Sequence, residues 1–367
     1  MPDREARIVL ASLLAPLPEV SFQQVNYERL GEMVVQHNLY NHVLHLIARA
    51  TRGVEPAFHT MLQEQALLAK QHGLLLTYQL RRVLTALSQH QVRAIPLKGP
   101  VLSERLHKDI SYRTSADLDV FVEFAHLETS FRALNEVGFK RLYRNDQASY
   151  KDVLLVEETT GVKLEMHVRL INPMSFSYGF PESTLWERAT PAVFQNVSHY
   201  QLAPEDEFAY LCVHCLSHLG IIELKWLADL YAYLHCQKDT AAFVTHVQGS
   251  THLQSLQPAI RFILGLLNAI ADYLSAPRPC PGIHTTEERL YAYVIQHLLW
   301  DAKLPIWDRF RLKYYIARTH QNPSTHFLKM VARSIAVSSE KEDAVDTGAT
   351  WKRIVRLLRP EGKRLLL

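Results

Sequence analysis

The sequence contains few cysteines, little net charge and no long uninterrupted apolar run. Four cysteines among 367 residues are too few for a disulfide scaffold and fit a reducing compartment. The net charge of +3 is too small to indicate nucleic acid as a partner. No uncharged apolar stretch approaches the roughly 18 residues of a membrane span, and Asp3, Arg4 and Glu5 interrupt the first apolar run, so no signal peptide is expected. These absences predict a cytoplasmic protein.

The composition is that of an ordinary globular protein, with 48% apolar and 21% charged residues. The length allows two or three domains with a sizeable core. We find no internal repeat and no low-complexity segment. Changes in pattern along the chain predict four regions: an N-terminal helical region (1–91), an α/β core (92–202), a C-terminal helical domain (203–335), and a linker with a basic amphipathic tail (336–367).

Helical spacing gives way to short strands near residue 92. Apolar residues recur at helical spacing from 55 to 90, and Ser21 is the predicted N-cap of an earlier helix that runs towards His37. Strands are predicted at 94–97, 117–122, 139–143, 150–157, 162–170 and 200–202, and helices from Gly99-Pro100 and at 125–137. This order predicts an α/β (α+β) fold class, with a small mixed sheet flanked by helical regions.

Two of the predicted strands carry carboxylates on one face. Successive side chains of a strand point to opposite faces, so Asp117 and Asp119 project together while Leu118 and Val120 point into a core. Glu165 opposes its apolar neighbours in the same way. Asp-x-Asp alone is common in surface turns, but the strand flanks, the upstream glycine turn and the downstream carboxylate favour a catalytic site. Three converging carboxylates would suit magnesium.

A Lys98-Gly99 turn precedes the carboxylates by one predicted helix. Glycine lets the backbone approach a phosphate, and the start of the following helix presents N–H groups and a positive dipole end. Lys98 or Arg113 could neutralise a triphosphate, and arginine is the better shaped for bidentate contact. In a two-metal phosphoryl transfer, Asp117 and Asp119 would hold both ions, and Glu165 would complete the acceptor-side site or act as general base.

These motifs resemble those of the uncharacterised nucleotidyltransferase family of the DNA polymerase beta-like superfamily. Its "LKG … R … D-I-D-L-L-V" signature is similar to 95–99, Arg113 and 116–122, and its "E-x-H-W-x-L" strand to 163–170. A helical segment of the family is similar to 202–206 followed by His214, His218, Lys225, Trp226 and Asp229. Two departures are Pro100, which lacks an N–H, and Val168 in place of tryptophan.

The resemblance implies a nucleotidyltransferase core and an enzyme that uses a nucleoside triphosphate such as ATP. We expect it to move the monophosphate to a hydroxyl of a small molecule or protein and to release pyrophosphate, with Mg²⁺, or alternatively Mn²⁺, as cofactor. The expected catalytic and metal-binding residues are Asp117, Asp119 and Glu165. The expected nucleotide-binding residues are Lys98, Gly99, Arg113, His167, His214, Lys225 and Asp229.

Other interpretations remain open. The chain could be a catalytically inactive module that keeps the scaffold, which Pro100 would suit, or a helical metal phosphohydrolase using His214, His218 and Asp229. The two histidines lie four residues apart on one helix face and could equally line a cleft or hydrogen-bond in the core. The basic amphipathic tail at 351–367 could dock on a membrane or protein, or pack on its own domain.

Overall fold

The computed structural model describes residues 4–14, 20–50, 53–142, 152–170, 180, 182–217, 223–280, 282–283, 291–292 and 294–295. The chain divides into two compact units, residues 1–305 and 306–367, and every described residue belongs to the first. The predicted linker and tail at 336–367 lie outside the described residues. The predicted boundaries at 91, 202 and 335 stay predictions.

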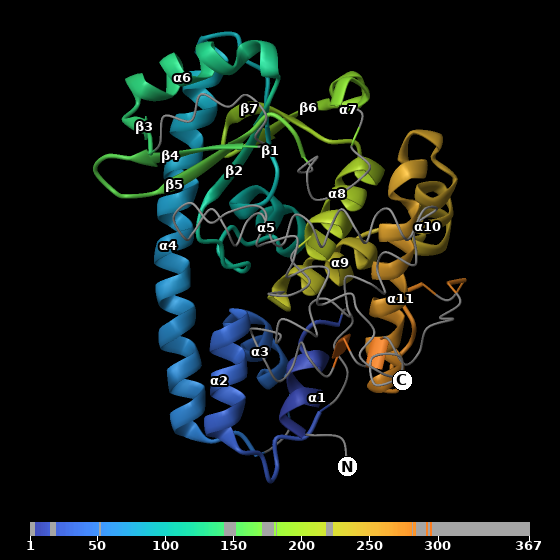
Figure 1. The fold of residues 1–367 in the computed structure, drawn as a ribbon. Helices are drawn as coiled ribbons and strands as arrows, with labels where there is room; N and C mark the ends of the chain where they lie inside the picture. The colour runs from blue at the N-terminus through green and yellow to red at the C-terminus, as the bar shows by residue number, and fades with distance from the viewer. Residues whose placement is uncertain are drawn as a thin grey trace, which may run out of the picture. The chain divides into compact units, whose positions relative to one another are not determined.

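Four helices open the described part of the chain. They are α1 (Arg4–Ala11), α2 (Tyr27–His37), α3 (Tyr40–Ile47) and α4 (Pro56–Gln89). The predicted N-cap at Ser21 is wrong. The Asn26 side chain caps α2 by accepting the Arg29 N–H at 3.1 Å, whereas the Ser21 hydroxyl accepts the Gln23 N–H in a local turn. α4 is 34 residues long and runs from α2 and α3 up to the sheet (Figure 1).

The sheet has five strands and is mixed, which confirms the predicted fold class. Its strands are β1 (Ala94–Pro96), β2 (Leu118–Val122), β3 (Phe139–Arg141), β4 (Asp152–Glu157) and β5 (Lys163–His167), in the order β1-β2-β5-β4-β3. Only β2 and β5 pair in parallel, and the other neighbours are antiparallel. Helix α5 (Gly99–His107) follows β1, and the short η1 (Phe124–His126) and α6 (Leu127–Glu136) follow β2.

One face of this sheet packs on helices. Leu118 and Val120 of β2 and Leu164 and Met166 of β5 are buried in a core built with apolar side chains of α4 and α6. Each such side chain stabilises the fold by about 1.5–3 kcal/mol when fully buried. Because side chains alternate along a strand, the intervening Asp119 and other polar residues of β2 and β5 occupy the opposite face.

A second, two-stranded sheet follows helix α7 (Glu182–Arg188). Its strands are β6 (Thr190–Phe194) and β7 (Val197–Gln201), and β7 packs against β1 and α4. The predicted strand at 200–202 is therefore the end of a hairpin strand, and β6 escapes prediction because it is mostly exposed and contains Pro191. Gln195 and Asn196 both have positive φ at the turn, as a two-residue hairpin of this kind requires.

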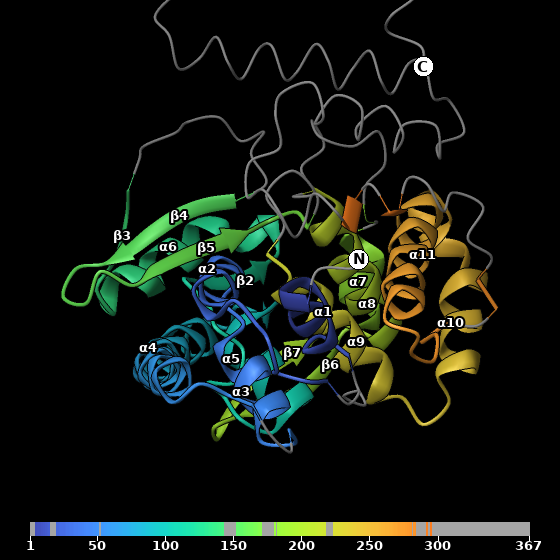
Figure 2. The same ribbon diagram turned by 90° about the horizontal axis from the view of Figure 1, so that it is seen from below.

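The last described elements are helical. They are α8 (Pro204–Ser217), α9 (Lys225–His235), α10 (Thr240–Gly249), η2 (Thr251–Leu256) and α11 (Gln257–Tyr273). α8 packs against α9, α10 and α11 (Figures 1 and 2). Within the described ranges, no helix has the length and apolar character needed to cross a membrane. The predicted cytoplasmic location stays a prediction.

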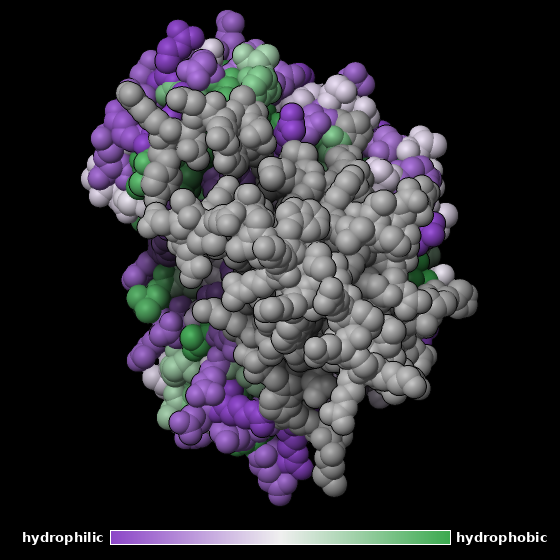
Figure 3. Space-filling model, viewed as in Figure 1, coloured by the Kyte–Doolittle hydropathy of each residue, from purple (hydrophilic) through white to green (hydrophobic). Residues whose placement is uncertain are grey.

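The surface drawn in colour in Figure 3 is mostly hydrophilic, with small hydrophobic patches near the left edge, where α4 runs in Figure 1. α4 exposes Leu67, Leu68, Leu74 and Tyr78. The first three lie in the stretch between its contacts with α2 and α3 and its contacts with the sheet.

The turn between β4 and β5 depends on one buried carboxylate. The side chain of Glu157 is 4% exposed and accepts hydrogen bonds from the Thr159 and Thr160 backbone N–H groups at 3.2 and 2.7 Å. It also accepts from the Thr160 hydroxyl at 2.6 Å and pairs with Arg82 at 3.4 Å. Burial alone would raise the pKa of Glu157, but these donors outweigh burial and lower it.

We predict that Glu157→Gln lowers the free energy of unfolding at pH 7 by about 1–3 kcal/mol, because a neutral amide cannot replace a buried anion that accepts several hydrogen bonds. A carboxyl whose pKa is lowered by folding stabilises the protein above its unfolded pKa and loses that effect as the pH falls through its folded pKa. Denaturant unfolding should therefore show the two proteins converging in acid. Glu158→Gln, at an exposed neighbour, is the control and should change stability little.

Candidate active site on the open face of the sheet

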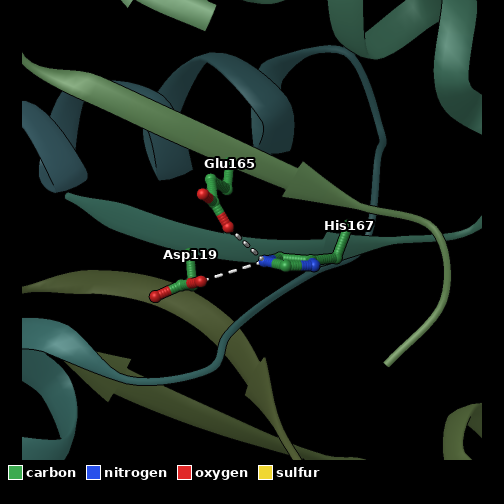
Figure 4. A group of neighbouring side chains, drawn as sticks. All are labelled: Asp119, Glu165 and His167. Carbon is green, nitrogen blue, oxygen red and sulfur yellow. Dashed lines mark hydrogen bonds and ion pairs between the residues drawn. The ribbon is translucent and has the colours of Figure 1, made fainter. Parts of the chain in front are cut away.

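Strands β2 and β5 bring two carboxylates and an imidazole together. Asp119 and Glu165 are register partners on these parallel strands, and His167 follows two residues after Glu165 on the same face (Figure 4). One ligand atom from each of the three residues lies within 4.8 Å of the others. Asp119 and His167 are buried, whereas the Glu165 side chain is 38% exposed. This is the one such group among the residues that the structure describes.

Both oxygens of Asp119 have a partner. His167 Nε2 lies 2.9 Å from Oδ1, and Lys98 Nζ lies 3.2 Å from Oδ2. A carboxylate only accepts hydrogen bonds, so the proton of this bond is on His167 Nε2. Burial would raise the pKa of Asp119, but Lys98 and His167 outweigh burial and hold it well below its usual range. Asp119 is therefore a fixed negative charge.

The fixed negative charge of Asp119 helps to raise the pKa values of the neighbouring carboxyl groups. Burial, followed by the charges of Asp119, Asp117 and Asp152, raises the pKa of Glu165 to about 7. Burial and Asp119 likewise raise the pKa of Asp117, which lies just before β2. The site thus gathers more negative than positive charge, and an added cation would relieve the repulsion.

Asp152 belongs to this group although the sequence analysis does not single it out. It is the register partner of His167 on β4, and its Oδ2 lies 3.7 Å from His167 Nδ1. The sequence signal was available in principle, because Asp152 lies in a predicted strand. Its neighbour across the sheet could not be known without the register between β4 and β5.

The Lys98-Gly99 turn lies directly beside the carboxylates. Leu97 N–H donates to the Asp119 carbonyl oxygen at 3.0 Å, which ties the turn to β2. Gly99 has φ +64°, a left-handed conformation that side chains disfavour, and an added Cβ would meet no atom of the described residues within 4 Å. α5 begins at Gly99 without a side-chain N-cap, so no capping side chain occupies the N–H groups of its first turn. Pro100 reduces the number of these N–H groups by one. The turn therefore offers backbone N–H groups next to open space.

Helices α8 and α9 contribute aromatic and imidazole groups. The His214 ring centroid lies 4.9 Å from that of Trp226 and 6.0 Å from that of Tyr210. His214 is also one of the groups that lower the pKa of Asp119. Tyr210, one helical turn before His214, is also near Lys98 and Asp119. Tyr210 is not among the residues predicted from the sequence, although its spacing from His214 places it on the same face. His218 lies outside the described residues.

The remaining nucleotide-binding candidates pair within the protein. Arg113 Nε lies 3.0 and 2.7 Å from the two oxygens of Asp229, and both side chains are buried. Arg113 also donates to Ser115 Oγ at 2.7 Å. Lys225 Nζ lies 2.5 Å from Glu223 Oε2. Burial raises the pKa of Asp229 in spite of Arg113 and lowers the pKa of Lys225.

The family that the chain resembles in sequence is confirmed by a family model. The model of the uncharacterised nucleotidyltransferase family matches residues 23–272, which is more than half of the chain. The chain belongs to this family. The matched range contains all described members of the site, from Lys98 to Asp229. No curated protein is similar enough to this chain to count as a match.

Two solved structures of nucleotidyltransferase type are distantly similar. The antibiotic-resistance factor ANT(2'')-Ia has 12% identity and a TM-score of 0.33, with 51% of this chain and 91% of that chain covered. An antigenic nucleotidyltransferase-like protein from Paracoccidioides brasiliensis has 15% identity and a TM-score of 0.38, with 57% and 95% covered. Both scores lie below 0.5, so we transfer no residue or substrate from either protein.

We predict that the Arg113–Asp229 pair is strongly coupled. Arg113→Met or Asp229→Leu alone should lower the free energy of unfolding by about 3–5 kcal/mol, because each leaves the other charge buried without its partner. The double variant should lose far less than the sum of the two. Urea denaturation measures all three variants.

The exposed pair Arg278–Asp272 is a matched control, because it also makes two contacts, at 2.7 and 2.8 Å. Its coupling in the same cycle should stay within about 1 kcal/mol. Additive losses at Arg113 and Asp229 would show that the two residues are not a structural pair.

Proposed function

We propose that this family member is a metal-dependent nucleotidyltransferase that transfers a nucleoside monophosphate from a triphosphate to a hydroxyl and releases pyrophosphate. The acceptor would be a small molecule or a protein. The observation that carries the proposal is the register pairing of Asp119 with Glu165 on parallel strands, next to the Lys98-Gly99 turn.

The donor set fits Mg²⁺, with Mn²⁺ as the alternative. Carboxylate oxygens are the ligands that these ions prefer, and the mutual repulsion of Asp117, Asp119 and Glu165 is the electrostatic demand that a divalent ion meets. Asp119 would hold it with Glu165 and Asp117. Such an ion binds phosphate oxygens and stabilises the charge that builds on them.

The residues of the chain have distinct parts in the proposed reaction. The acceptor oxygen attacks the α-phosphorus, the bond from that phosphorus to the bridging oxygen breaks, and pyrophosphate leaves with that electron pair. Glu165, the most exposed member of the metal-ligand group, is our candidate for the base that takes the hydroxyl proton. Lys98 and the Gly99 backbone would bind the triphosphate.

The other predicted nucleotide-binding residues are assigned on their placement. His167 orients Asp119 through its Nε2 proton, and His214 is close enough to Asp119 to lower the pKa of that carboxyl. Lys225 is close enough to Asp117 to lower the pKa of that carboxyl and would add positive charge near the nucleotide. Arg113 and Asp229 would act on the nucleotide indirectly, by holding the chain that leads into β2.

We predict that Asp119→Asn, Glu165→Gln and the double variant Asp117→Asn/Asp119→Asn release pyrophosphate about 10²–10⁴-fold more slowly than the wild type, or not at all. Pyrophosphate release is measured with each of the four triphosphates and a mixture of small-molecule extracts as acceptor source. Glu136→Gln, at an exposed helix position, is the activity control. Unchanged turnover in folded Asp117→Asn/Asp119→Asn protein would refute the catalytic assignment.

A second candidate, an inactive nucleotide-binding scaffold, is favoured by one observation. Pro100 stands in the first turn of α5 and cannot donate a backbone hydrogen bond to a phosphate. Calorimetry of triphosphate binding with Mg²⁺ and with EDTA separates the two. For the enzyme we expect binding that requires Mg²⁺ and is lost in Asp119→Asn. Binding that is equally tight in EDTA and in Asp119→Asn would favour the scaffold.

A further inference from the structure

Tyr210 of α8 holds a polar group that the fold itself does not use. The residue is 1% exposed, and its hydroxyl oxygen is buried and makes no hydrogen bond with any described residue. The charged groups that act on this hydroxyl are Lys98, Asp119 and Glu165, so it faces the carboxylate site. Lys98 lies close enough to the phenol oxygen to act on it.

A buried hydroxyl without a partner destabilises a fold, because it has lost its bonds to water and gained none. Two other buried tyrosines of the C-terminal helices avoid this destabilisation, because their hydroxyl groups have hydrogen-bond partners. The Tyr233 hydroxyl lies 2.9 Å from the Pro204 carbonyl oxygen and 3.0 Å from Glu207 Oε2, and the Tyr231 hydroxyl donates to the Leu267 carbonyl oxygen. Tyr210 therefore differs from both because its hydroxyl has no hydrogen-bond partner among the described residues.

The surroundings decide what kind of group can satisfy this hydroxyl. The Lys98 ammonium only donates hydrogen bonds, so it favours the phenol lone pairs and leaves the O–H to point to an acceptor. The hydroxyl makes no hydrogen bond to Asp119, whose two oxygens contact His167 and Lys98. Burial raises the pKa of Tyr210, so the phenol stays protonated and remains a donor. An anionic oxygen from outside the protein is the group that fits.

We propose that the Tyr210 hydroxyl donates a hydrogen bond to a phosphate oxygen of the bound nucleoside triphosphate, beside the Lys98 ammonium. Tyr210 is then a substrate-binding residue supplied by α8, close to Lys98. The turn has open space next to Gly99, where a phosphate would enter. This inference rests on the proposed function, since it needs a triphosphate in the site.

The test is Tyr210→Phe, which keeps the ring and removes only the hydroxyl. Dissociation constants are measured by calorimetry for each of the four Mg²⁺-triphosphates and for Mg²⁺-pyrophosphate. We expect binding of the preferred triphosphate to weaken roughly 10-fold or more, as loss of a hydrogen bond to a charged group does. The melting temperature without nucleotide should stay the same or rise, because no protein hydrogen bond is lost.

Tyr233→Phe is the matched control. It removes the same atom from a buried tyrosine of the neighbouring helix, but there the hydroxyl has protein partners. Its melting temperature should fall while its triphosphate affinity stays that of the wild type. The two variants are thus expected to give opposite signatures, which a merely structural role of Tyr210 would not produce.

Three results would overturn the inference. Wild-type affinity in Tyr210→Phe would show that the hydroxyl does not contact the nucleotide. A fall in melting temperature like that of Tyr233→Phe, with affinity unchanged, would show that the hydroxyl is structural. If the wild type binds none of the triphosphates, the proposed function fails and this inference with it. In the first two cases the proposed function stands, because wild-type binding is then intact.

Discussion

The site depends on the parallel pairing of β2 with β5. This pairing sets Asp119 directly beside Glu165, and the period of two along each strand then places His167 on the same face. A shift of register by one residue would send the carboxylates into the core that α4 and α6 cover. Burial of the apolar face, with residues such as Val120 and Met166, therefore fixes the position of the acidic face.

Carboxylates placed so close together repel one another, and the protein compensates this repulsion at Asp119 but not at Glu165 or Asp117. Lys98 and His167 hold the pKa of Asp119 well below its usual range, while Glu165 and Asp117 have pKa values above their ordinary range. The protein thus keeps one carboxylate ionised, whereas a bound cation would be needed to stabilise the others as anions. A similar difference exists between two tyrosines of the C-terminal helices. The Tyr233 hydroxyl has a protein partner, whereas the Tyr210 hydroxyl has none among the described residues.

Sequence reasoning reached the sheet because the alternation of apolar and polar residues is strong in β2 and β5. It failed where the signal is weak or non-local. β6 is exposed and lacks alternation, and at α2 both Ser21 and Asn26 are good capping residues, of which only one can begin the helix. Asp152 and Tyr210 could not be assigned, because their meaning depends on the strand register and on how α8 meets the sheet.

The motif residues of this chain divide by what their side chains touch. Lys98, Asp119 and His167 meet at the polar face of the sheet, whereas Arg113 pairs with Asp229 of α9. Arg113 lies in the segment between α5 and β2, so this buried pair links α9 to the segment that leads into Asp117 and Asp119. A second link joins Asn38, the residue that ends α2, to Glu223 at 2.9 Å. Helical regions on both sides of the sheet in sequence are thereby linked to the strand that carries Asp119.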